Sequence, residues 1–94
     1  MDNRIKLTFD KSLTCLADNP YGRTVYEEQV KGKIDYSQIA YIEFPEQITR
    51  IASSFVQGFF EEIVKKVGIL GVGKKVIVVA PGVDVEKTIY NNLQ

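Results

Sequence analysis

The sequence contains no histidine and a single cysteine, Cys15. Without histidine, neither a Ser-His-Asp triad nor a Cys-His nucleophile can be built, and a structural zinc site lacks its usual ligands. With one cysteine, no disulfide can form inside the chain, and Cys15 is expected to be a small buried hydrophobic residue. These absences predict a protein that is not an enzyme and that needs neither a metal nor a cofactor.

Net charge and long apolar runs are missing as well. The 12 lysines and arginines balance the 12 aspartates and glutamates, whereas a dedicated nucleic-acid-binding domain normally carries a basic excess. No apolar run is long enough to span a bilayer, and no apolar core of a signal peptide follows the charged first residues. We therefore expect a single domain over residues 1–94, located in the cytoplasm, with no nucleic-acid or membrane partner.

What is present is an alternation of strand and helix patterns. The predicted elements are strands at 4–10 and 12–16, a helix from 21 or 23 to 30, a strand at 38–44, a helix at 54–68, a strand at 76–80 and a last helix from 84 to the end. The β-branched strand at 76–80 is predicted in the middle of a sheet. The order predicts an α/β fold: a small mixed, largely parallel four-stranded sheet, β-β-α-β-α-β-α, with helices packed against it.

The central helix carries the strongest pattern. Apolar residues recur at every fourth position from Ile51 to Val67, with a second apolar row beside them, which predicts a helix lying across a sheet. Ser54 and Gln57 fit a capping box at its start, and Gly68 is a natural stop.

The glycine-rich segment at residues 68–75 spells G-x-x-x-x-G-K, as phosphate-binding loops do. Lys75 replaces the magnesium-binding Ser or Thr, and the segment runs from a helix into a strand, the reverse of a phosphate-binding loop. A flexible connection is the better interpretation, and a nucleotide-binding protein ranks last among the functional hypotheses.

Ser53 and Ser54 stand at the start of the central helix. The structural interpretation is a simple helix cap, since serine is among the commonest capping residues. The functional interpretation is a phosphorylation or partner-contact site, because a phosphate there would meet free N–H groups and the positive end of the helix dipole. This second interpretation expects the pair of hydroxyls to be open to solvent, and burial of both hydroxyls inside the protein would remove its basis.

These serines and the order of the elements resemble STAS domains, the fold of sulphate transporters and anti-sigma-factor antagonists. Members carry a D-S/T-S-G segment directly after an apolar strand, and the matching segment here is Ala52-Ser53-Ser54-Phe55. Ala52 and Phe55 stand where those domains have an acidic residue and a glycine. A divergent branch, the bacterial STAS-like domains of unknown function, is more similar, with its I-x-S-S-F motif and an upstream helix of the Gly22-Arg23 type.

The resemblance covers residues 21–93 and implies a STAS-like fold, with Ser53 at the phosphorylatable position. It also implies a regulatory partner, a histidine-kinase-like ATPase or an anti-sigma-type protein. The residues expected to bind the partner or accept phosphate are Ser53, Ser54, Thr49 and Arg50, with secondary contacts from Tyr21 and Arg23.

Two functional hypotheses follow from these patterns. The first is a small cytoplasmic regulatory module of a bacterium or phage, switched by phosphorylation at Ser53. The alternative is a structural or assembly module with the same fold and no switch, which would dimerise through an exposed sheet edge.

Overall fold

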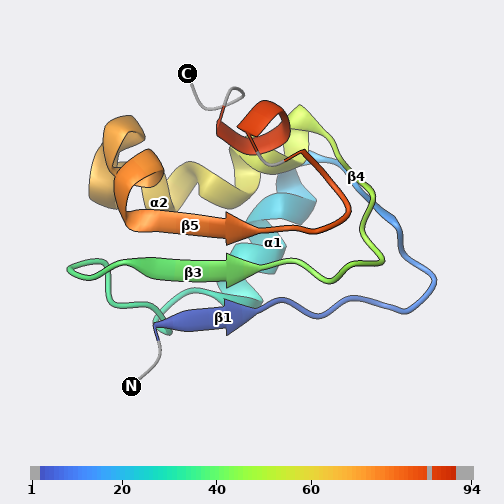
Figure 1. Cartoon of the computed structure of the whole chain (residues 1–94), viewed down its shortest axis with the longest axis horizontal. Coiled ribbons are helices and arrows are strands. Elements are labelled where there is room, and N and C mark those ends of the chain that lie inside the picture. Colours follow the sequence, from blue (N-terminus) through green and yellow to red (C-terminus); the bar gives the residue numbers. More distant parts are fainter. Residues whose placement is uncertain (1–2, 85, 91–94) are drawn as a thin grey trace.

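The computed structural model describes residues 3–84 and 86–90. Its strands form two small parallel sheets, and its helices pack beside them (Figure 1). The elements in order are β1 (Arg4–Lys6), β2 (Cys15–Leu16), α1 (Asn19–Gln29), β3 (Ala40–Glu43), β4 (Arg50–Ile51), α2 (Ser53–Lys75), β5 (Val76–Val79) and the short π-helix η1 (Glu86–Tyr90). The α/β class and the parallel pairing are as predicted, whereas the single four-stranded sheet is not.

The larger sheet has three parallel strands in the order β1-β3-β5. Its inner face is apolar, and Ala40, Ile42 and Val76 are buried there against the helices. The prediction that 76–80 lies in the middle of a sheet is wrong, because β3 takes the middle and β5 lies at an edge. The β-branched run of β5 therefore buries alternate residues only, with Ile77 and Val79 exposed on the other face.

The smaller sheet pairs β2 with β4 in parallel, and β4 was not predicted. The chain leaves the larger sheet after Leu7, whose N–H donates to the Glu43 carbonyl. It then turns at Asp10, whose carboxylate accepts hydrogen bonds from the N–H and hydroxyl of Ser12, which lower the pKa of Asp10. This turn carries the next segment away from β3, so β2 pairs with β4 and not with the larger sheet.

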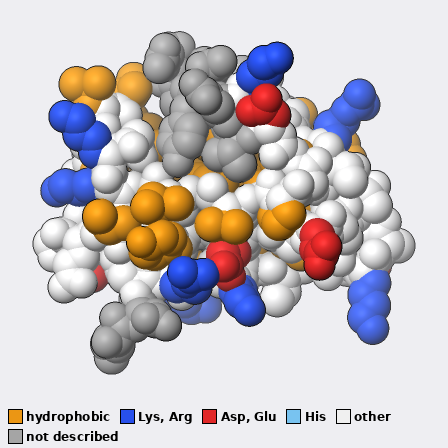
Figure 2. Space-filling model, viewed as in Figure 1, with side chains coloured by type: hydrophobic (Ala, Val, Ile, Leu, Met, Phe, Trp, Pro, Cys, Tyr) orange, Lys and Arg blue, Asp and Glu red, His pale blue; other side chains and the backbone are white. Residues whose placement is uncertain are grey.

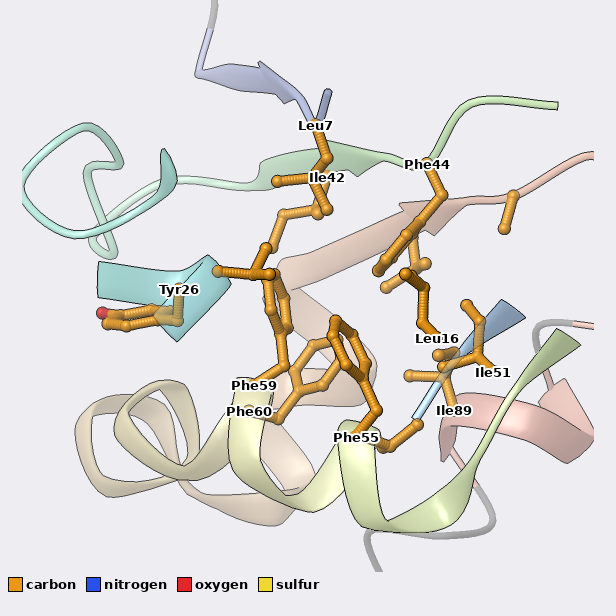
Figure 3. Packing of buried hydrophobic residues seen from close by; sticks show 14 of the residues in the cluster. Leu7, Leu16, Tyr26, Ile42, Phe44, Ile51, Phe55, Phe59, Phe60 and Ile89 are labelled. Carbon is orange, nitrogen blue, oxygen red and sulfur yellow. The ribbon is translucent and has the colours of Figure 1, made fainter. Parts of the chain in front are cut away.

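The two long helices cover one face of the larger sheet and enclose the core (Figures 1 and 3). Phe55, Phe59 and Phe60 of α2 are completely buried and point toward the sheet. The ring of Phe59 lies 5.9 Å from that of Phe44, just beyond β3, and 6.1 Å from that of Tyr26 on α1. The predicted apolar stripe is thus the face that α2 presents to the sheet and to α1.

α2 is interrupted where the sequence predicts its end. Gly68 has φ 78° and ψ 165°, outside helical geometry, so the stop is confirmed. Residues 69–75 are helical again, and the predicted flexible connection is wrong. Val72 is 1% exposed, and its burial against the core fixes this second helical piece.

The predicted last helix is seen in part. Asp84 caps its start as expected, since its carboxylate accepts the N–H of Lys87 at 3.2 Å. Ile89 is fully buried on η1. Residues 85 and 91–94 of that predicted helix lie outside the described residues.

α1 and α2 approach each other at two glycines. A Cβ on Gly22 would overlap the Phe55 carbonyl and lie 2.8 Å from the Phe59 nitrogen, and a Cβ on Gly58 would overlap the Asn19 carbonyl. These are backbone atoms, so no side chain can move aside. The contact fixes how far each helix start can lie from the other.

We predict that Gly58→Ala destabilises the fold by about 3 kcal/mol, because the helices must separate to admit a methyl group. Gly73→Ala is the matched control: it is also helical, has nothing within 4 Å of the added Cβ, and should stabilise by up to about 1 kcal/mol. Urea unfolding followed by circular dichroism measures both. Equal midpoints for the two variants would contradict the helix contact.

Candidate functional site

Two strand-to-helix junctions lie side by side in the structure. β2 leads into α1 and β4 leads into α2, and the two strands pair in parallel. The N–H of Thr49 donates to the Thr14 carbonyl at 2.8 Å, and the N–H of Ala52 donates to the Leu16 carbonyl at 2.7 Å. Because parallel strands end at the same edge, both helices begin next to each other. We call this site the paired junction; it comprises residues 14–21 and 49–55.

A short repeat in the sequence marks the paired junction. Residues 13–17 read L-T-C-L-A and residues 48–52 read I-T-R-I-A. In each copy the second apolar residue is buried, Leu16 at 0% and Ile51 at 6% exposed, while the residue before it is exposed. This similarity is the signal that could have predicted β4 and its pairing with β2.

Ser54 connects the two junctions. Its Oγ accepts a hydrogen bond from the backbone N–H of Asp18 at 3.1 Å. Asp18 precedes α1 and has φ 83°, the only positive φ among the described residues other than glycine. The predicted capping box is therefore wrong: the N-cap is Ala52, no side chain within the described chain caps α2, and Ser54 lies inside the helix. The half-buried Ser54 joins two elements instead of capping one.

Ser53 is the first residue of α2 and is exposed. Within the described chain, neither α1 nor α2 has an acidic residue in its first turn. The positive ends of both helix dipoles meet at this edge, where the acidic Asp18 is the N-cap of α1 and the start of α2 has no acidic residue. Such an edge favours a negative group on Ser53.

Thr49 and Arg50 lie four and three residues before Ser53 and are exposed. The Thr49 hydroxyl bonds back to the Thr14 carbonyl at 3.4 Å. Arg50 makes no ion pair with any of the described residues. The guanidinium of Arg50 is thus available for a partner or a phosphate, and it adds to the positive character of the paired junction.

Tyr21 and Arg23 lie on α1, at different distances from the serines. Tyr21 is 36% exposed, and its ring lies 5.8 Å from that of Phe55. Arg23 Nε contacts Glu61 Oε2 at 3.0 Å, further along α2. Glu27, four residues after Arg23 on α1, pairs with Lys31. Tyr21 belongs to the paired junction, whereas the charge of Arg23 is already compensated.

Two further residues of the paired junction differ from expectation or were overlooked. Cys15 is exposed, contrary to the predicted buried position, and it faces Arg50 across the β2–β4 pair. Asp18 was overlooked, and the bond from its N–H to Ser54 brings an exposed acidic residue next to the serines. The sequence position of Asp18, one residue beyond the L-T-C-L-A copy, is the signal that could have identified it.

The described residues include no cluster of histidine, cysteine, aspartate or glutamate that could hold a metal ion. The glycine-rich segment lies at the far end of α2 from Ser53, and Lys74 and Lys75 form its last turn, where a helix dipole is negative. That geometry does not correspond to a phosphate-binding loop. No helix in the described ranges combines the length and apolar character needed to cross a membrane.

Comparisons of the chain with protein-family models, with curated proteins and with solved structures find no match.

We predict that removing the Ser54 hydroxyl lowers the free energy of unfolding more than removing the Ser53 hydroxyl does. Ser54→Ala leaves the Asp18 N–H without its acceptor and should destabilise by about 1 kcal/mol. Ser53→Ala changes an exposed position and should alter stability by less than about 0.5 kcal/mol. Urea unfolding of both variants is the measurement, and equal midpoints would contradict the assigned role of Ser54.

Proposed function

We propose that the chain is a small regulatory module, resembling STAS domains, that binds a partner protein through the paired junction. The observation that carries this proposal is the exposed hydroxyl of Ser53 at the start of a helix whose N-cap, Ala52, has no capping side chain. The neighbouring Ser54, by contrast, is engaged with Asp18. One serine therefore fixes the geometry and the other is free to react or to be contacted.

Phosphorylation of Ser53 is the proposed switch. The Ser53 oxygen attacks the γ-phosphorus of ATP bound to the partner, the bond from that phosphorus to ADP breaks, and the hydroxyl proton passes to a base. Ala52 stands where STAS domains have their acidic residue, and we propose the carboxylate of Asp18 for the assisting role, since the backbone N–H of Asp18 bonds to the neighbouring Ser54. The new phosphate adds about two negative charges, which the two helix N-termini and Arg50 can accommodate without unfolding.

The partner class follows from the same proposal. A histidine-kinase-like ATPase would both supply the phosphoryl group and recognise the unmodified paired junction, and an anti-sigma-type protein would be released when the charge changes. The proposed location is the cytoplasm of a bacterium. Thr49, Arg50 and Tyr21 are exposed residues of the paired junction and provide the proposed contact surface, while Arg23 contributes less because Glu61 pairs with it.

The test uses immobilised wild-type protein, Ser53→Ala and Ser53→Asp, each exposed to a lysate of the native host. We predict that wild type and Ser53→Ala retain an ATPase-type partner, and that Ser53→Asp binds it at least about tenfold more weakly, because a negative charge is placed in the interface. Quantitative mass spectrometry of the retained proteins gives the ratio. Equal capture by the two variants, or no such partner in any sample, would contradict the proposal.

The second candidate is an assembly module, favoured by the position of β5 at a sheet edge with a run of β-branched residues. In that case the chain should form a tight homodimer, and neither Ser53 variant should alter its mass. Light scattering over a range of concentrations separates the hypotheses. A monomer at all concentrations removes the assembly module, and a dimer unaffected at Ser53 favours it.

A further inference from the structure

The larger sheet has a second face that no described helix covers. Its residues form two rows across the strands, Arg4–Tyr41–Ile77 and Lys6–Glu43–Val79, as the strand register shows. We call this surface the outer sheet face. Figure 2 shows apolar side chains gathered there, with basic side chains close by.

The apolar part of the outer sheet face is unusual for a solvated surface. Ile77 and Val79 are 38% and 36% exposed, and Ile39, two residues before Tyr41, is 51% exposed. Sheets made only of parallel strands are almost always covered on both faces. A contiguous exposed apolar patch with polar residues around it is typical of a surface that binds another molecule.

The charges around this patch indicate what kind of molecule binds. The guanidinium of Arg4 lies 4.8 Å from the centre of the Tyr41 ring and pairs with Glu43, so the acidic residue in the two rows is compensated. Lys6 on β1 and Lys75, directly before β5, are exposed and form no ion pair within residues 3–84 and 86–90. The patch is therefore apolar in the middle and positive at its margin.

We propose that the outer sheet face binds an acidic amphipathic segment of a partner protein. Apolar side chains of that segment would cover Ile39, Ile77 and Val79, and its carboxylates would reach Lys6 and Lys75. A second copy of this chain fits less well, because face-to-face packing would bring equal charges together. This surface is separate from the paired junction, so the chain would have two binding sites.

The probe is a synthetic helical peptide of about four turns with leucine on one face and glutamate on the other, and its control carries lysine in place of glutamate. The isotope-labelled protein is titrated with each peptide while amide NMR signals are recorded. We expect saturable shifts at Tyr41, Ile77 and Val79 with the glutamate peptide only, and a weaker affinity at high salt.

Variants make the test specific. The double variant Lys6→Glu, Lys75→Glu should bind the glutamate peptide at least about tenfold more weakly. The matched double variant Lys11→Glu, Lys65→Glu has the same net charge with both changes off this face, and should bind as wild type does. Ser53→Asp should also bind as wild type does, which separates this inference from the proposed function.

Several results would overturn the inference. These are the absence of saturable shifts with the glutamate peptide, equal binding of the lysine peptide, and equal loss of affinity in the two double variants. Shifts of the same amides on raising protein concentration alone would assign the face to a second copy. Displacement of the peptide by phosphatidylserine vesicles would assign it to a membrane surface.

Discussion

The backbone contact between α1 and α2 is the constraint on which the rest of the structure depends. Neither Gly22 nor Gly58 has room for a Cβ, so the two helices approach more closely than other residues would permit. This approach brings Asp18 within hydrogen-bonding distance of Ser54. The paired strands β2 and β4 hold the other side of the same junction. These contacts fix the residues on either side of Ser53, which itself remains exposed to solvent.

Much of the fold follows from local pattern. The apolar periodicity of α2 predicted both the helix and the face that it buries, since a wide stripe needs a sheet to cover it. The alternation of strand and helix patterns predicted parallel pairing, which the structure confirms on both sides of β3. Gly68 was predicted to stop the helix, and its positive φ does so. In each case the signal lies within one segment or in the order of neighbouring segments.

The errors arise where the signal lies in the relation between distant segments. β4 has two residues, too few for any periodicity, and only its pairing with β2 makes it a strand. The β-branched residues of β5 indicate a strand, but they do not show whether that strand pairs on one side or on both. At the candidate site both hydroxyls were expected to be open to solvent, and only Ser53 is exposed. Ser54 is half-buried and bonded to Asp18, 36 residues away, and such a contact cannot be seen from sequence spacing.

The two surfaces differ in the chemistry that they offer. The paired junction is polar and lies where two helix dipoles are positive, which suits a reversible charge change on Ser53. The outer sheet face is apolar with positive margins, which suits a lasting contact with an acidic segment. A module with both surfaces would stay bound to a partner through the outer sheet face and be switched at the paired junction. α2 connects the two surfaces, because it begins at Ser53 and ends directly before β5.

Hydrogen exchange of the Asp18 amide tests the central claim most directly, because that claim is the connection between the two helix starts. The account predicts that this amide exchanges slowly in the wild-type protein, that Ser54→Ala makes it exchange as fast as an open loop amide, and that Ser53→Ala leaves it protected. Fast exchange of the Asp18 amide in the wild-type protein would contradict the account.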